Sequence, residues 1–419
     1  MKRELLKTVI YDQRNLIKNF QIVDREYKFD MNVNYVLIGL RRAGKSTLLY
    51  KIVQDLIAAG TDWNQIIYIN FEDERLAEFS LEDFNDILSV QAEMSDKRGW
   101  FFLDEVQNID GWEKFARRMA DSKEHIFITG SNAKMLSQEI ESRLGGRYRT
   151  QYVTPYNFKE FLTAKNIDFS EKAILGTKDR GKIKRAFKTY FYFGGFPESI
   201  QYEDKREYVS SIYQKVLLGD IAARNGIRNT NGLRLLIKKI AESVKDEVSY
   251  SKLHNILKTV GVSISKDAVI DYVGYAQQSY LIFAIRNYYS KFVDKETTPK
   301  YYFSDNGLLN LFLDKAEARL LENLVAINLR NRYKDKVYYL KSQNLDIDFF
   351  VEKTGEVIQA AYSVSDISYD RETKALVQAA SVVKKAKKFF IITYDEEKEL
   401  NIGGIKITVI PVWKWLLKN

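Results

Sequence analysis

The chain contains no cysteine among its 419 residues. Disulfides, cysteine nucleophiles and thiolate metal sites are therefore excluded, and the composition fits a reducing compartment such as the cytoplasm. Only two histidines are present, His125 and His254, so neither a zinc site nor a histidine-based catalytic triad has much support.

Long apolar runs are also missing, and none approaches the ~18 uncharged residues that a membrane-spanning helix needs. The first twenty residues carry scattered charges and no apolar block, so we expect no secretory signal. A composition of 45% hydrophobic and 29% charged residues is typical of a globular chain with real cores. At roughly 100–200 residues a domain, the length predicts about two to four domains in a cytoplasmic protein without membrane contact.

The chain has a modest excess of positive charge, with 65 basic against 56 acidic residues and a net charge of +9. An excess of this size permits a nucleic-acid partner but does not require one. On a chain of this length it is equally well explained by a solvated surface, and both interpretations stay open.

The stretch with the clearest chemistry is "YVLIGLRRAGKSTLLYKIV", which begins at Tyr35. Its apolar start predicts a buried strand, and residues 39–46 match the pattern G-x-x-x-x-G-K-[ST]. The apolar residues that follow recur at helical spacing. Strand, loop and helix in this order are the context that a phosphate-binding loop requires.

Each residue type in this loop has a chemical reason. Glycines let backbone N–H groups approach phosphate oxygens at the N-terminus of the helix. Lys45 supplies a mobile positive charge for the β- and γ-phosphates, and the Ser46 hydroxyl is a hard ligand suited to Mg²⁺. The sequence therefore predicts nucleotide-binding residues at Gly39, Arg42, Ala43, Gly44, Lys45, Ser46 and Thr47.

A second motif, "WFFLDEVQ", predicts a buried strand that ends in two acids. We assign Asp104 to the Mg²⁺ ion, together with Ser46, and Glu105 to the base that polarises an attacking water. Residues 66–73 and 125–136 predict two more strands, so a parallel sheet with ligands at the carboxyl ends of its strands is expected. Ser131 or Asn132 follows the last of them and either senses the γ-phosphate or caps a helix.

These motifs, together with "FITGSNAKMLSQEIESRLGGR" and "FYFGGFPE", resemble those of a family of prokaryotic AAA+-type P-loop ATPases. In that family a winged helix and a C-terminal domain of restriction-endonuclease-like fold follow the ATPase domain. The resemblance implies Mg²⁺-dependent ATP hydrolysis with Asp104 and Glu105 as the acidic pair and Asn132 as the sensor.

The resemblance also places a Gly-Arg pair after the sensor helix, at residues 146 and 147. AAA+ ATPases commonly use an arginine of a neighbouring subunit to stabilise the transferring phosphate. Arg147 is the first candidate for this catalytic role and Arg143 the second, which would require a homo-oligomer. The alternative is a surface arginine paired with Glu139 or Glu141.

The expected architecture is α/β: an AAA+-type P-loop parallel sheet with a helical lid, followed by a winged helix and an α/β restriction-endonuclease-like domain. The expected boundaries are 1–160 for the ATPase core, 161–230 for the lid and linker, 231–295 for the winged helix and 296–419 for the C-terminal domain.

The winged-helix interpretation depends on three helical patterns between residues 233 and 280, followed by a strand-like hairpin. Ser249 and Ser265 stand where helix N-caps belong. The exposed face of the third helix carries Lys266 but also Asp267 and Asp271, a poor match for a phosphate-lined groove. DNA binding and a protein-binding or domain-coupling role both stay open.

Beyond residue 296, the order of helix and strand patterns resembles the nuclease fold named for its Pro-Asp and Glu-x-Lys elements. Glu322, Asp348 and Gln359 stand at the positions of that fold's metal-binding residues, and Ala361 stands where its lysine belongs. Without the lysine, efficient cleavage is not expected. The leading hypothesis is an ATP-driven conformational switch that acts on nucleic acid or a protein; the alternative is an ATP-gated DNA-binding or nuclease-like protein with a degenerate C-terminal site.

Overall fold

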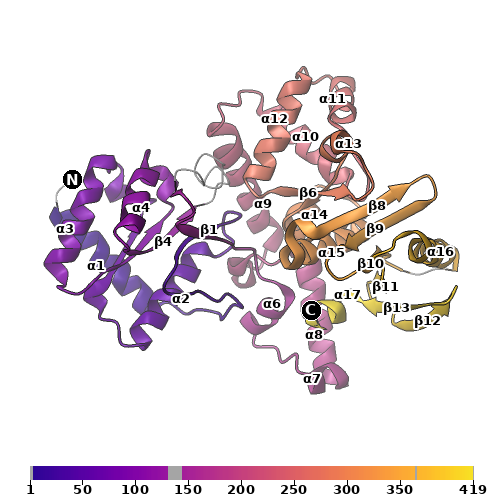
Figure 1. The fold of residues 1–419 in the computed structure, drawn as a ribbon, viewed down its shortest axis with the longest axis horizontal. Coiled ribbons are helices and arrows are strands. Elements are labelled where there is room, and N and C mark those ends of the chain that lie inside the picture. Colours follow the sequence, from indigo (N-terminus) through magenta and orange to yellow (C-terminus); the bar gives the residue numbers. More distant parts are fainter. Residues whose placement is uncertain (1–2, 131–143, 364–365, 419) are drawn as a thin grey trace. The chain divides into compact units, whose positions relative to one another are not determined.

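The computed structural model of the chain describes residues 3–130, 144–363 and 366–418. The chain divides into two compact units, residues 1–154 and residues 155–419 (Figure 1). We call them the first and the second unit. The finer division into four parts stays a prediction. No helix in the described part of the chain is long and apolar enough to span a bilayer.

The first unit alternates helices and strands. The helices are α1 (Arg3–Asn19), α2 (Lys45–Ala58), α3 (Phe84–Met94) and α4 (Trp112–Asp121), and the strands are β1 (Asn34–Ile38), β2 (Ile66–Asn70), β3 (Trp100–Asp104), β4 (His125–Gly130) and β5 (Tyr148–Tyr152). All described strands of this unit lie in one parallel sheet with the order β2-β3-β4-β1-β5. The predicted parallel sheet is confirmed, and β5 is a strand that the sequence did not reveal.

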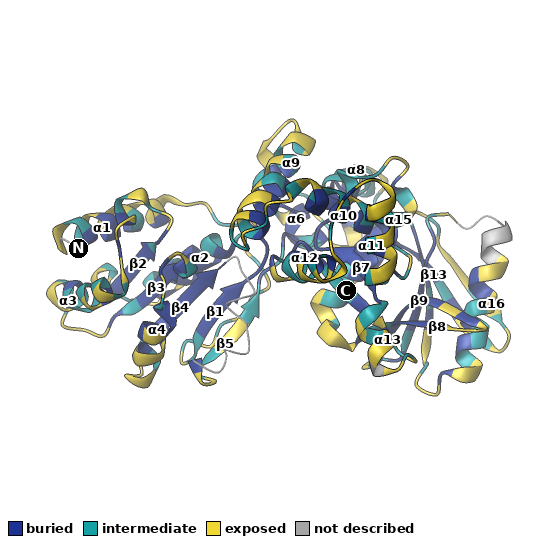
Figure 2. Ribbon diagram, turned by 90° about the horizontal axis from the view of Figure 1, so that it is seen from above, coloured by how far each residue is buried: buried dark blue, intermediate teal, exposed yellow. Residues whose placement is uncertain are grey.

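Burial explains why these strands form. Nearly every residue of β1 to β4 is buried, because helices cover both faces of the sheet, with α1 and α2 on one side and α4 on the other (Figure 2). A parallel strand covered on both faces reads as a continuous apolar run, which is how "YVLI" and "WFFL" appear in the sequence. Since the strands are parallel, Gly39, Asp104 and Thr129 come to the same carboxyl-end edge.

The second unit begins with helices and continues into strands. Its helices are α6 (Phe158–Ala164), α7 (Glu171–Leu175), α8 (Thr177–Phe193), α9 (Lys205–Lys215), a π-helix (Val216–Ala223), α10 (Thr230–Glu242), α11 (Tyr250–Thr259), α12 (Lys266–Gln278), α13 (Phe292–Thr297), α14 (Asn306–Asn310), α15 (Glu317–Tyr333), α16 (Asp366–Val382) and α17 (Val412–Lys418). Its strands are β6 (Ile282–Asn287), β7 (Lys300–Phe303), β8 (Val337–Ser342), β9 (Leu345–Val351), β10 (Glu356–Ala360), β11 (Lys388–Thr393), β12 (Lys398–Ile402) and β13 (Ile405–Pro411).

The three helices expected before β6 are present as α10, α11 and α12, with the side chains of Ser249 and Ser265 capping the last two as predicted. The β6–β7 hairpin, however, does not end at the helices. β6 pairs in parallel with β8, which makes the described strands of this unit one eight-stranded sheet of order β12-β13-β11-β10-β9-β8-β6-β7. The expected boundary at residues 295 and 296 therefore passes between two strands of a continuous sheet.

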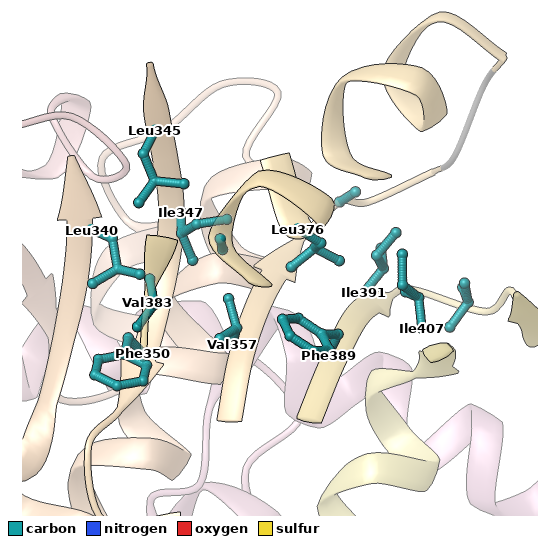
Figure 3. Close-up of a cluster of buried hydrophobic side chains, with 13 residues drawn as sticks. Leu340, Leu345, Ile347, Phe350, Val357, Leu376, Val383, Phe389, Ile391 and Ile407 are labelled. Carbon is teal, nitrogen blue, oxygen red and sulfur yellow. The ribbon is translucent and has the colours of Figure 1, made fainter. Parts of the chain in front are cut away.

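The core of the C-terminal strands is an apolar cluster under α16 (Figure 3). Leu376 and Val383, on α16 and just beyond its end, belong to this cluster with side chains from β8 to β11 and β13. In β11 and β13 the contributing residues alternate along the strand, as the two-residue period of a strand requires: Phe389, Ile391, Ile407 and Val409.

Asp305 ties the glycine pair of "FYFGGFPE" to the strands. Its buried carboxylate accepts hydrogen bonds from the backbone N–H of Gly195 at 2.8 Å and of Gly307 at 2.7 Å. A Cβ on Gly195 would lie 2.1 Å from the Tyr156 carbonyl oxygen, and one on Gly194 would lie 1.8 Å from the Asp305 carboxylate. The Gly194–Gly195 segment is thus a close backbone contact within the second unit.

Candidate functional site

The loop between β1 and α2 has the geometry of an anion-binding site. Gly44 precedes α2 in the left-handed region at φ 94°, and Arg42 is also left-handed at φ 62°. No side chain of the described residues caps the start of α2, although most helices rely on such a cap. The first N–H groups of α2 therefore face outward at the positive end of the helix dipole, where an anion binds favourably.

Lys45 lies across this loop and is 4% exposed. Its ammonium group donates to the carbonyl oxygens of Gly39 and Leu40, each at 3.2 Å, and its Nζ lies 3.9 Å from Glu105 Oε1. Neutral carbonyls are weaker partners for an ammonium than a charged phosphate oxygen. The lysine is thus held within reach of both the loop and the acidic pair.

Asp104 is completely buried at the end of β3. Its carboxylate accepts hydrogen bonds from the hydroxyls of Tyr68, at 2.5 Å, Thr129 and Ser46. Burial, and then the charge of Glu105, raise the pKa of Asp104 above its ordinary value, against the effect of these hydroxyls. Two adjacent carboxylates that are shielded from solvent favour the binding of a cation beside them.

Glu105 follows in the left-handed region at φ 51°, which turns the chain sharply after β3. Its backbone N–H donates to the Thr129 hydroxyl at 2.9 Å, and its Oε2 accepts from Gln107 Nε2 at 2.5 Å. A non-glycine residue in this conformation is uncommon and is found where a site needs a side chain in one orientation.

The structure brings four of the sequence-predicted site residues together: Lys45, Ser46, Asp104 and Glu105. Asn132 lies outside the described residues, as do Ser131 and Arg143. Arg147 is described, and its Nε donates to the Asp121 carboxylate. The partner that the structure describes is thus Asp121, whereas Glu139 and Glu141 lie outside the described residues. The role of Arg147 toward a neighbouring subunit stays a prediction.

Sequence reasoning missed three residues at this site. Tyr68 is the third-last residue of β2, and Thr129 is the second-last residue of β4. A polar side chain so near the carboxyl end of a buried strand is a usable signal. Arg25 gives no such signal, yet it donates to the loop carbonyl of Ala43 at 2.9 Å and to that of Thr154 at 2.7 Å. These contacts hold the loop to the end of the sheet.

The C-terminal acidic residues form a separate cluster in the second unit. Glu322 on α15 and Asp348 on β9 both lie near the ammonium group of Lys300, which opens β7. Gln359 lies beside them but is bonded to the backbone of β9. Ala361 is buried in the apolar cluster under α16. Lys300 is the residue that sequence reasoning missed, and a charge opening the apolar segment "KYYF" was its signal.

The first unit has the fold and loop of a P-loop nucleotide-binding protein, and the AAA domain family matches residues 32–162. A second family, described as a domain of unknown function (DUF8612), matches residues 184–319, which run from α8 into α15.

The chain is also similar to curated proteins over nearly its whole length. It is 32% identical to the uncharacterized protein MJ1544 of Methanocaldococcus jannaschii, over 99% of this chain and 96% of that protein. An uncharacterized protein of Haemophilus influenzae is 32% identical over 91% of this chain and 94% of its own length. The chain therefore belongs to the family of these proteins, as a member that carries an AAA domain.

Among solved structures, the Walker-type ATPase PABY2304 of Pyrococcus abyssi is similar at a TM-score of 0.43 and 15% identity, over 71% of this chain and 99% of that one. The ORC1 protein of Aeropyrum pernix, solved in complex with DNA, gives a TM-score of 0.30 at 14% identity, over 78% and 94%. At these scores, no property of either protein is carried over to this chain.

Proposed function

We propose that the first unit binds ATP with Mg²⁺ and hydrolyses it, and that this turnover changes how the second unit engages a nucleic-acid or protein partner. The observation that carries the proposal is the convergence of a buried lysine, an uncapped helix N-terminus and two adjacent carboxylates at one edge of a parallel sheet. Ligands of open α/β sheets bind at this edge.

The loop residues have distinct tasks in this proposal. Backbone N–H groups of the loop surround the phosphates, and they belong to Gly39, Arg42, Ala43, Gly44 and Thr47. Lys45 exchanges its two carbonyl partners for phosphate oxygens.

The acidic side of the site holds the metal and the water. Ser46 and Asp104 would hold Mg²⁺, which supplies charge stabilisation to the phosphates when bound. The Ser46 hydroxyl stabilises the charged form of the Asp104 carboxylate and so opposes the rise in pKa that burial causes, which supports this assignment. Glu105 accepts the proton of the attacking water, because its carboxylate is held beside Lys45 and in front of the loop. Asn132 and Arg147 keep their proposed roles as sensor and arginine finger.

The direct test is phosphate release by the purified full-length chain. We expect Mg²⁺-dependent turnover that falls by at least about 100-fold in Lys45→Ala, since one lost contact to developing phosphate charge has this effect. Lys51→Ala is the matched control, because Lys51 lies on the same helix and pairs with Asp55 away from the loop. Equal release by wild type and Lys45→Ala would contradict the proposal.

The partner class is open to the same assay. The described exposed face of α12 carries Lys266, Asp267 and Asp271, so the helix offers no strongly basic surface, and nucleic acid and protein remain the two candidates. Stimulation of turnover by DNA or RNA that weakens with salt identifies nucleic acid. Stimulation only by a protein fraction identifies a protein partner.

Tyr68 gives a prediction about metal binding. Tyr68→Phe removes the hydroxyl that donates to Asp104 while leaving the buried ring in place. We expect the Mg²⁺ concentration at half-maximal turnover to rise by about 10-fold, with a smaller change at saturating Mg²⁺, because partners behind a metal ligand tune its affinity. Tyr35→Phe is the control: Tyr35 lies in β1, and its hydroxyl contacts Asp30. If both variants show the same Mg²⁺ dependence, the Tyr68 hydroxyl has no role in metal binding and the residue contributes only to packing.

A further inference from the structure

The acidic cluster of the second unit is closed by a lysine from another strand. Lys300 is 3% exposed, and its Nζ lies 3.7 Å from Glu322 Oε1 and 3.5 Å from Asp348 Oδ1. Glu322 itself is completely buried. The three residues come from β7, α15 and β9, and this position between two carboxylates is one that a divalent cation would otherwise occupy.

The two carboxylates have further neighbours besides Lys300. Glu322 Oε1 accepts from the Tyr302 hydroxyl at 2.8 Å, and Asp348 Oδ2 accepts from the Ala360 N–H at 2.9 Å. Glu322 Oε2 has no hydrogen bond among the described residues but lies 3.5 Å from Lys245 Nζ. The two carboxylates thus face two ammonium groups, those of Lys300 and Lys245.

A further metal ligand is not available from Gln359. Its Oε1 accepts from the Asp348 N–H at 2.8 Å, and its Nε2 donates to the Asp346 carbonyl at 3.0 Å. Both ends of the amide are therefore used by the backbone of β9. Within the described ranges, no group of three or more histidine, cysteine, aspartate or glutamate side chains is arranged to hold a metal ion.

Lys300 keeps its charge in this setting. Burial by itself lowers the pKa of Lys300, but the nearby charges of Glu322, Asp348 and Asp346 outweigh burial and raise that pKa above its ordinary value. An arriving divalent ion would meet a fixed ammonium group less than 4 Å from each carboxylate. The residues present therefore do not fit the Mg²⁺ ion that the nuclease-like order of elements implied.

We propose that Lys300 is a built-in substitute for a divalent cation: its ammonium group closes the Glu322–Asp348 pair, and the centre works as a metal-free ion-pair junction between β7, α15 and β9. Metal-dependent phosphodiester cleavage is then not an activity of this centre. One consequence is specific to this geometry. Removing the ammonium group leaves two buried carboxylates facing each other, so a variant without it acquires a cation site that the natural chain lacks.

The test uses electron paramagnetic resonance to count the Mn²⁺ ions bound by the full-length chain without nucleotide. Any ion bound by the first unit contributes equally to every variant, so differences between variants report on the second unit. We expect Asp348→Asn to bind as many ions as wild type. We expect Lys300→Ala to unfold about 10 °C lower, because an uncompensated buried charge is costly, and to gain one ion per chain that raises its melting temperature. Asp348→Asn added to Lys300→Ala removes that ion again.

Two results overturn the proposal. One is a wild-type chain that loses one bound Mn²⁺ ion on Asp348→Asn, since the centre would then hold a metal beside Lys300. The other is a folded Lys300→Ala variant that binds no additional ion. If Lys300→Ala does not fold, the comparison of wild type with Asp348→Asn decides alone, because it leaves the lysine in place.

Discussion

Replacing Glu105 with glutamine is expected to abolish ATP turnover while leaving nucleotide binding intact. Glutamine has nearly the same size, and the backbone N–H that donates to Thr129 is unchanged, so the turn after β3 should persist. A neutral amide cannot accept the proton of the attacking water, and loss of a general base costs about 10²–10⁴-fold in rate. We therefore expect phosphate release to fall by at least about 100-fold.

The measurement pairs phosphate release with binding of a fluorescent ATP analogue. Glu124→Gln is the matched control, because Glu124 undergoes the same chemical change just before β4, at the opposite end of the sheet, where it pairs with Arg98. The control should hydrolyse at the wild-type rate. Turnover by Glu105→Gln at that same rate would assign the base to another residue.

Replacing Asp305 with alanine is expected to destabilise the second unit strongly. The buried carboxylate satisfies the backbone N–H groups of Gly195 and Gly307, which lie 112 positions apart, and alanine would leave both donors without an acceptor. Each unsatisfied buried donor costs about 1–3 kcal/mol, so we expect a loss of about 2–6 kcal/mol in the free energy of unfolding. Hydrogen exchange at these two amides localises the effect to the second unit.

The control for this substitution is Asp204→Ala, which removes the exposed N-cap of α9 that accepts from Glu207 N–H at 2.8 Å. A lost cap of this kind costs about 1 kcal/mol. Equal losses from the two substitutions would mean that Asp305 contributes no more than a surface cap.

The pH dependence provides a second readout with a definite sign. Burial raises the pKa of Asp305 to about 6, opposed by its backbone N–H donors. Because the folded-state pKa exceeds the unfolded one, the folded state binds more protons between about pH 4 and pH 6. Protonation of Asp305 therefore stabilises the folded state. This stabilisation is at its full value below the unfolded-state pKa, and it is lost as the pH rises through about 6. The cost of Asp305→Ala should thus be smaller at pH 7 than at pH 5, and the opposite slope would contradict this account.

The first unit was predictable because its signals are local. A strand covered on both faces reads as an unbroken apolar run, and the phosphate loop is contiguous in the sequence, so β1 to β4 and the start of α2 follow from residues 35–130 alone. β5 was not predicted, since "YRTQY" is a half-exposed edge strand without an apolar run.

The second unit was harder because its decisive contacts join distant residues. Asp305 meets Gly195 across 110 positions, and Lys300 meets Asp348 across 48. The absence of a lysine at position 361 was correctly read from the sequence, but the cation comes from β7, which only the pairing of β6 with β8 places in the same sheet. Strand order of this kind depends on long-range packing that no local pattern encodes.

The central claim is that ATP and Mg²⁺ bind between the loop of residues 39–46 and the carboxylates of Asp104 and Glu105. The most direct measurement is a crystal structure of the full-length chain with Mg²⁺ and a non-hydrolysable ATP analogue. The account predicts phosphate density against the first N–H groups of α2 and Lys45, with the metal beside Ser46 and Asp104. A saturating analogue bound elsewhere, with this loop empty, would contradict it.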